Sequence, residues 1–208
     1  MQAVILAAGM GRRLGELTGD NTKCMLEVNG VKLIDRALEC LAECNLSRIV
    51  MVVGYKRENV KSYLGNNYKG IEIVYVDNPI YDKTNNIYSL YLAKDYLVAE
   101  DTLLLESDLI YESAVVKRIV ENDYPNLALV DKYESWMDGT VVTIDENNNI
   151  ENFLSKNQFL FENINKYYIK YTLIIKLCQV FLLKVTKYKN KKRYLPPFDS
   201  KYRFYFLF

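Results

Sequence analysis

The sequence contains no histidine, and this absence removes several kinds of functional site. Without an imidazole the chain cannot form a Ser-His-Asp triad, a Cys-His nucleophile pair or a zinc site of mixed Cys and His ligands. The four cysteines include no C-x-x-C pair, and the one-turn spacing of Cys40 and Cys44 is more typical of small core residues than of a redox pair. We therefore expect reduced thiols in a cytoplasmic protein.

Long apolar runs are also missing. No stretch reaches the ~20 apolar residues of a membrane span, and lysines interrupt each candidate in the C-terminal part. The chain starts directly with a strand-like run and lacks the basic region that opens a signal peptide. The sequence thus predicts a protein without a transmembrane segment.

The net charge of +1 conceals an asymmetry along the chain. From Lys156 onward there are 12 basic and 2 acidic residues, whereas the preceding part has 15 basic and 24 acidic residues. An acidic body argues against a nucleic-acid-binding surface there.

Strand and helix patterns alternate along the first 126 residues. Runs rich in Val, Ile and Leu predict buried parallel strands at 3–7, 48–54, 71–76 and 101–107. One-sided apolar spacing predicts helices at 33–44, 85–97 and 111–122, with Asn85 as a candidate N-cap. This alternation predicts an α/β fold: a Rossmann-like three-layer α/β/α arrangement around a mostly parallel twisted sheet. Shorter strands are expected after residue 126.

The loop after the first strand is the place where an open α/β sheet usually binds its ligand. Gly9 and Gly11 let the backbone approach a ligand closely. Two known phosphate-binding motifs do not match the sequence. Lys23 lies too far from the glycines for a Walker motif, and Leu14 occupies the third glycine position of the dinucleotide fingerprint. The two glycines alone leave a plain turn and an anion-binding loop equally open.

The whole string from Val4 to Val28 is more specific than its glycines. It resembles the signature of nucleotidyltransferases that activate small phosphorylated compounds, including sugar-1-phosphate nucleotidylyltransferases and CTP:phosphocholine cytidylyltransferases of the bacterial LicC type. The matching positions are Leu6, Ala7, Ala8, Gly9, Gly11, Arg13, Leu14, Leu17, Thr18 and Lys23. Glu16 and Thr22 replace two prolines of the pattern, which we expect to loosen the loop without removing a charged contact.

This resemblance implies a reaction as well as a nucleotide-binding loop. An acceptor phosphate oxygen attacks the α-phosphorus of a nucleoside triphosphate, and pyrophosphate leaves. The attacking oxygen is already ionised, so no general base is needed, and catalysis consists mainly of positioning and charge neutralisation. The resemblance assigns Arg13 to the β- and γ-phosphates and Lys23 to the α-phosphate. The alternative for Lys23 is a solvated loop lysine.

Asp108 follows the strand at 101–107 and matches the family aspartate that binds Mg²⁺. The alternative for Asp108 is a cap for the helix at 111–122. Strand alternation points Glu106 to the other face of the sheet, which makes it a poorer ligand candidate.

The segment "TNNIYSLYLA" at 84–93 resembles a stretch of the LicC-type enzymes. The resemblance places Asn85, Asn86 and Ser89 near the base or the acceptor, where side-chain amides can pair with cytosine. The alternative is an N-cap followed by an ordinary helix face. The larger side chains of the segment are expected in the core: Tyr88, Leu90 and Tyr91.

Three residues are candidates for binding the acceptor. Trp136 is the only tryptophan, and in phosphocholine cytidylyltransferases a tryptophan near this position helps to hold choline. Asp138 could add a counter-charge. Lys156 fits the lysine of the E-K-P motif in sugar-nucleotide enzymes, although Ser155 and Asn157 depart from that motif.

The composition changes near residue 157, so we assign residues 1–156 to the catalytic domain and 157–208 to an atypical tail, which could be a truncated remainder of the same domain. No glycine follows Gly139 and no alanine follows Ala128. The tail is either a basic, aromatic segment that docks on the acidic body or a membrane surface, or an out-of-frame translation of AT-rich DNA. Its lack of periodicity and turn residues favours the frameshift, which would impair turnover.

Together these features predict a Mg²⁺-dependent enzyme that transfers CMP from CTP to phosphocholine or a related small phosphate or phosphonate. Two alternatives stay open: a sugar-1-phosphate nucleotidylyltransferase that uses UTP or dTTP, and an inactive nucleotide-binding remnant.

Overall fold

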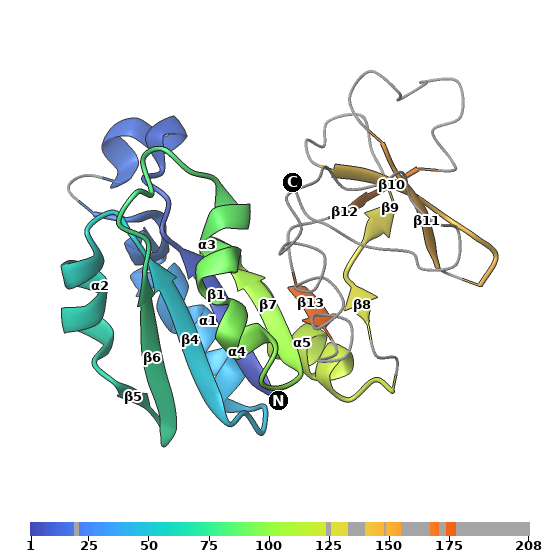
Figure 1. Cartoon of the computed structure of the whole chain (residues 1–208), viewed down its shortest axis with the longest axis horizontal. Helices are drawn as coiled ribbons and strands as arrows, with labels where there is room; N and C mark the ends of the chain where they lie inside the picture. The colour runs from blue at the N-terminus through green and yellow to red at the C-terminus, as the bar shows by residue number, and fades with distance from the viewer. Residues whose placement is uncertain are drawn as a thin grey trace.

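The computed structural model describes residues 1–18, 21–123, 126–132, 140–147, 149–154, 167–170 and 174–177. Within this part of the chain, a seven-stranded sheet has the order β5-β6-β4-β1-β7-β13-β8 (Figure 1). Its central strands run parallel: β6 (Ile71–Asp77), β4 (Arg48–Val53), β1 (Gln2–Ala7) and β7 (Thr102–Glu106). These strands confirm the predicted mostly parallel α/β sheet.

The outer strands of this sheet are antiparallel to their neighbours. They are β5 (Asn67–Tyr68), β13 (Ile174–Leu177) and β8 (Leu127–Ala128). A second sheet has the order β11-β10-β12-β9, from β11 (Ile150–Leu154), β10 (Thr140–Ile144), β12 (Tyr167–Lys170) and β9 (Asp131–Lys132). A short hairpin joins β2 (Glu27–Val28) to β3 (Val31–Lys32).

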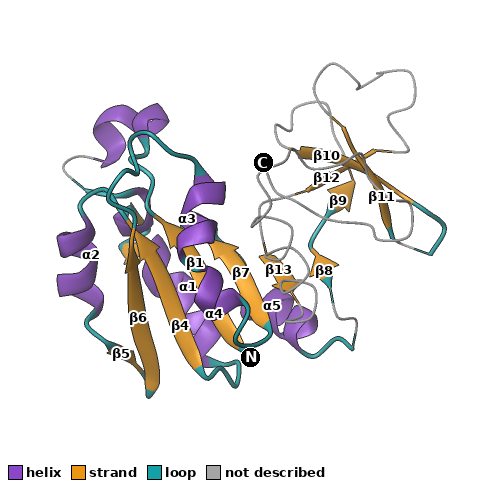
Figure 2. Cartoon of the chain, in the orientation of Figure 1, coloured by secondary structure: helices purple, strands orange, loops and turns teal. Residues whose placement is uncertain are grey.

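Helices cover both faces of the main sheet, as Figure 2 shows. One face packs against α1 (Leu33–Ala42), α2 (Arg57–Leu64) and α5 (Ser113–Val120). The other face packs against α3 (Asn86–Leu92) and α4 (Lys94–Leu97). The single helix predicted at 85–97 is therefore two short helices, divided at Ala93.

Strand alternation distributes the buried side chains between these two faces. In β1, Ala3 and Ile5 face α1, whereas Val4 and Leu6 face α3 and α4. All six residues of this strand are buried, which explains the continuous apolar run at 3–7. Gln2 is the polar exception, and its side chain donates to the Thr102 hydroxyl at 3.1 Å. Cys40 and Cys44 lie in the core beside α5, as their spacing predicted.

Two strands come from the segment predicted to be an atypical tail. β12 pairs with β10, and β13 lies between β7 and β8 in the main sheet. Residues 167–170 and 174–177 thus extend the sheets of the preceding domain, while the proposed boundary at residue 156 stays a prediction. In the described part of the chain, no helix is long and apolar enough to cross a membrane.

Candidate active site

The glycine loop, residues 8–11, lies beyond the carboxyl end of β1. The chain then continues into two short 3-10 helices, η1 (Arg12–Thr18) and η2 (Lys23–Met25). Figure 1 shows η1 above the arrowheads of the parallel strands. Gly11 has a φ of +64°, and a Cβ at this position would lie 2.7 Å from Cγ of Lys23. A glycine is thus required for the backbone angle and for the close approach of the lysine stem. By contrast, nothing lies within 4 Å of a Cβ built on Gly9.

Lys23 and Asp108 meet across this loop. The lysine Nζ donates to Oδ2 of Asp108 at 2.8 Å, although 85 residues separate the two in the sequence. Their side chains are 34% and 27% exposed, so both charges remain within reach of a ligand. Asp108 does not cap α5, because Glu112 holds the N-cap position.

Lys23 is oriented by its two neighbours, which point into the protein. Thr22 and Cys24 are each 1% exposed, and the Thr22 hydroxyl lies 2.9 Å from the Cys24 sulfur. Burial raises the pKa of the Cys24 thiol to about 11, although the Thr22 hydrogen bond opposes this shift. Thr22 also accepts a backbone hydrogen bond from Met25 at 3.1 Å. Hydrogen bonds therefore hold the segment around Thr22 without a proline, and the loosening expected from the missing prolines stays a prediction.

The ends of β1 and β4 are joined beside the glycine loop. The backbone N–H of Tyr55 donates to the carbonyl oxygen of Ala8 at 3.1 Å. Gly54 allows this contact, because a Cβ there would lie 2.7 Å from the same oxygen and 2.7 Å from Cβ of Tyr81. Tyr81 belongs to the loop between β6 and α3, so three loops converge at the carboxyl edge of the sheet.

A buried asparagine that was not predicted from the sequence organises the loop between β6 and α3. The Asn78 side chain donates to the hydroxyls of Thr84 and Ser89, both at 3.1 Å, and accepts from the backbone of Ile80 at 3.1 Å. Ser89 is only 3% exposed, so its hydroxyl lies in this network and reaches a ligand only indirectly. The Asn78-Pro79 pair at the end of the strand could have pointed to this residue, since an Asn-Pro dipeptide marks a turn.

The first residues of α3 have distinct roles. Asn85 accepts a hydrogen bond from the backbone of Ile87 at 3.2 Å, which confirms the predicted N-cap. Asn86 donates from Nδ2 to Oε1 of Glu106 at 3.3 Å. The core prediction is wrong for Tyr91, which is 40% exposed because it lies on the outer side of its short helix. Leu90, in contrast, packs against the core.

Several predicted site residues lie outside the part of the structure that can be described. These are Trp136, Asp138 and Lys156, together with the side chain of Arg13. Among the predicted positions of the first strand and its turn, Leu6, Ala7 and Ala8 are buried and contribute backbone rather than side chains to the edge of the sheet.

Comparison with known proteins decides the family. Residues 3–147 match the MobA-like NTP transferase domain. The chain belongs to this nucleotidyltransferase family. Its fold agrees with that assignment, since the structure matches CTP:phosphocholine cytidylyltransferase from Streptococcus pneumoniae (LicC) with a TM-score of 0.70 and 23% identity, over 91% of this chain and 75% of that one.

Two curated relatives are similar to this chain in sequence. CMP-5'-(3-aminopropyl)phosphonate synthase from Streptomyces rubellomurinus is 37% identical over 145 residues, which cover 70% of this chain and 23% of the relative. CTP:phosphoglutamine cytidylyltransferase from Campylobacter jejuni is 36% identical over 141 residues, which cover 65% of this chain and 54% of the relative. The matched part of the chain thus spans 23% of the length of the first relative and 54% of the second.

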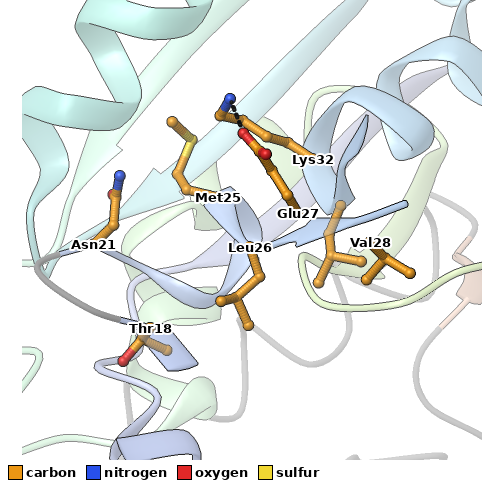
Figure 3. A pocket seen from close by; sticks show the side chains of 8 residues that line it. Thr18, Asn21, Met25, Leu26, Glu27, Val28 and Lys32 are labelled. Atoms are coloured by element: carbon orange, nitrogen blue, oxygen red, sulfur yellow. Dashed lines mark hydrogen bonds and ion pairs between the residues drawn. The ribbon is translucent and has the colours of Figure 1, made fainter. Parts of the chain in front are cut away.

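The chain also has a hollow of about 570 Å³ beside the glycine loop (Figure 3). Thr18 and Asn21 line one side, and the β2–β3 hairpin with its Lys32–Glu27 ion pair of 2.9 Å lines another. Of the described residues that line it, Thr18 alone belongs to the family signature. The hollow therefore adjoins the loop, and the Lys23–Asp108 pair is not part of its lining.

The described residues fit a magnesium ion that is shared with a nucleotide. Among them, no group of three or more Asp, Glu, Cys or His side chains could hold a metal unaided. Mg²⁺ is commonly bound by one or two carboxylates together with substrate phosphates. The partly exposed carboxylate of Asp108 beside the glycine loop matches that pattern.

Proposed function

We propose that this chain is a cytidylyltransferase that transfers CMP from CTP to a small phosphate or phosphonate acceptor. The single observation that carries the proposal is the 2.8 Å contact between Lys23 and Asp108, the two charged family positions that the resemblance assigns to the reacting phosphate and its metal. The names of both relatives above contain a cytidine nucleotide, which supports CTP as the donor.

In the proposed reaction an oxygen of the acceptor forms a bond to the α-phosphorus of CTP. The bond between the α-phosphorus and the bridging oxygen breaks, and pyrophosphate carries away that electron pair. Lys23 would turn from Asp108 to the α-phosphate, where negative charge increases in the transition state. Arg13 would bind the β- and γ-phosphates, and the backbone N–H groups near Gly9 and Gly11 would face the same anion.

Asp108 would hold Mg²⁺ in the proposed complex. A bound magnesium ion offsets the charge of the phosphates and so favours attack by an anion. In the structure, Lys23 balances the charge of this carboxylate at 2.8 Å. Binding of the nucleotide and the metal would thus replace the Lys23–Asp108 ion pair by two others, one between Lys23 and the α-phosphate and one between Asp108 and Mg²⁺.

The remaining contacts in the proposal divide between base and acceptor. Asn85 and Asn86 would lie near the cytosine, with Ser89 supporting the segment through Asn78 at 3.1 Å. Trp136, Asp138 and Lys156 would bind the acceptor, with the tryptophan face toward a cationic amine and the lysine toward the phosphate or phosphonate.

A pyrophosphate-release assay tests the proposal. CTP, UTP and dTTP would each be combined with phosphocholine, 2-aminoethylphosphonate and glucose 1-phosphate in the presence of Mg²⁺. We expect release with CTP and either phosphocholine or 2-aminoethylphosphonate, and loss of release in the Asp108→Asn variant. Release with UTP or dTTP and glucose 1-phosphate alone would show a sugar-nucleotide enzyme, and no release from any pair would contradict the proposed activity.

A further inference from the structure

The contact between Asn86 and Glu106 joins α3 to the end of β7. Asn86 is the first residue of α3, and its Nδ2 lies 3.3 Å from Oε1 of Glu106. Glu106 is the last residue of β7 and pairs with Leu6 of β1, two residues before the glycine loop begins at Ala8. The amide of Asn86 is therefore fixed at the same edge of the sheet as the loop.

The chemistry of the two groups determines which way the amide is turned. A carboxylate accepts hydrogen bonds and donates none, whereas the two ends of a carboxamide differ, one being a donor and the other an acceptor. The nitrogen of Asn86 must therefore face Glu106, and its carbonyl oxygen faces away from the carboxylate. Glu106 thus selects one of two otherwise similar orientations of the amide.

The backbone on both sides of this contact is held independently. The Asn85 side chain caps the helix through Ile87 at 3.2 Å, and Asn78 connects the preceding loop to Ser89 at 3.1 Å. Glu106 is fixed by the β1–β7 ladder. With both backbones in place, the hydrogen bond to Glu106 restrains the orientation of the Asn86 amide.

We propose that Glu106 is a positioning residue that presents the Asn86 carbonyl oxygen to the nucleotide base and thereby favours cytosine over uracil and thymine. Cytosine carries an amino group, a donor, at the position where uracil and thymine carry a carbonyl oxygen, an acceptor. A carbonyl oxygen held toward that position accepts a hydrogen bond from the amino group of cytosine and repels the carbonyl oxygen of uracil or thymine. This inference rests on the proposed function, because it takes the base to lie beside Asn86.

The test is the ratio of CTP to UTP affinity, measured on the full chain by isothermal titration calorimetry with Mg²⁺. In the Glu106→Gln variant the partner of Asn86 becomes an amide that both donates and accepts, so both orientations of Asn86 become possible. We expect the CTP preference to fall by about tenfold, the scale of one misplaced hydrogen bond. Glu39→Gln is the matched control, since Glu39 accepts from Lys69 at 2.6 Å elsewhere on the surface and should leave the ratio unchanged.

A second variant separates orientation from general damage to the fold. Asn86→Ala removes the oxygen and should lower the CTP preference to a similar extent. In that background Glu106→Gln should have no further effect on the ratio, because the group that it orients is gone. A purely structural contact would lower the melting temperature and leave the ratio unchanged.

The outcomes distinguish this inference from the proposed function. A wild-type chain that prefers CTP and a Glu106→Gln variant with the same preference would overturn the inference while leaving the enzyme class intact. Equal wild-type affinity for CTP and UTP would overturn it as well. Preferential CTP binding that depends on Glu106 without any pyrophosphate release would support the inference and contradict the proposed reaction.

Discussion

At the scale of single residues, two opposite charges are central to the proposed activity. Lys23 and Asp108 lie 2.8 Å apart and are both about one-third exposed or less. An ion pair of this kind contributes roughly 0–1 kcal/mol to stability. Its contribution to folding is therefore small, and its position beside the glycine loop is better explained by ligand binding.

Replacement of Lys23 by alanine should separate activity from stability. Loss of the ammonium group at the α-phosphate should lower kcat by about 100-fold or more. The free energy of unfolding should change by less than about 1 kcal/mol. Pyrophosphate release and urea unfolding measure the two effects.

Lys32→Ala is the control for this variant, because Lys32 forms a similar ion pair with Glu27 at 2.9 Å. It should leave kcat unchanged. If the wild-type chain is active and both variants keep its kcat, then Lys23 does not take part in the reaction.

Glu100 gives a prediction about pH. Burial alone would raise the pKa of this carboxyl, but hydrogen bonds from Ser47 at 2.7 Å and from the amine of Met1, with N–O at 3.1 Å, hold it below its ordinary value of 4.5. A carboxyl with a lowered pKa stabilises the fold above its unfolded pKa, and this stabilisation is lost as the pH falls through the folded pKa. Glu100→Gln should therefore be less stable than wild type at pH 7.

The difference between the two chains should begin to shrink as the pH falls below about 4, where the unfolded carboxyl takes up its proton first, and should vanish once the folded carboxyl is protonated as well. Urea unfolding at several pH values measures it. A difference in stability that is the same at all pH values would mean that packing, rather than charge, accounts for the effect of Glu100.

At the scale of elements, the glycine loop combines backbone geometry with the placement of a side chain. Gly11 has a φ of +64°, and the lysine stem occupies the space that a Cβ would need. In a left-handed conformation any other residue costs roughly 1–2 kcal/mol. At Gly11 a second effect is added, because Lys23 must move.

Gly11→Ala should therefore weaken CTP binding as well as stability. Gly30→Ala is the control, since Gly30 has a φ of +73° but nothing lies within 4 Å of the place that a Cβ would take there. Both variants should lose roughly 1–2 kcal/mol of stability. Only Gly11→Ala should lose CTP affinity, by about tenfold or more. Equal affinities in calorimetry would show that the loop tolerates displacement of Lys23.

The elements that could be predicted from sequence are those with a strong local pattern. The four parallel strands were evident because strands buried on both faces are continuous apolar runs, and Asn85 was evident as a cap. The pairing of Asn86 with Glu106 and the network of Asn78 depend on contacts between distant segments. Alternation would put residues 106 and 108 on the same face of a strand, so it gave no reason to separate Glu106 from Asp108, and it did not reveal the partner of Glu106; β7 in fact ends at Glu106. The break at Ala93 and the exposure of Tyr91 were missed because helical spacing alone does not fix where a helix ends or how it is rotated.

At the scale of the whole molecule, one described strand from the C-terminal quarter of the sequence, β13, belongs to the main sheet. β13 forms antiparallel pairs with β7 on one side and β8 on the other. Without β13, an edge of β7 would be exposed next to the strand end that leads to Asp108. An exposed edge strand destabilises a sheet and promotes aggregation.

Two truncations test the role of this strand. A chain ending at residue 156 lacks β12 and β13, whereas a chain ending at residue 177 keeps every strand that the structure describes. We expect the shorter chain to lose cooperative unfolding or to aggregate, and the longer one to retain the melting temperature of the full chain. Equal behaviour of both in thermal unfolding and size-exclusion chromatography would place the domain boundary at residue 156 after all.

The central claim is that the glycine loop, Lys23 and Asp108 together bind a nucleoside triphosphate with magnesium. Titration calorimetry of the full chain with CTP, with and without Mg²⁺, tests it most directly. We expect binding that Mg²⁺ strengthens, that Lys23→Ala weakens, and that loses its Mg²⁺ dependence in Asp108→Asn. A folded chain that binds CTP equally well with and without Mg²⁺, or not at all, would contradict it.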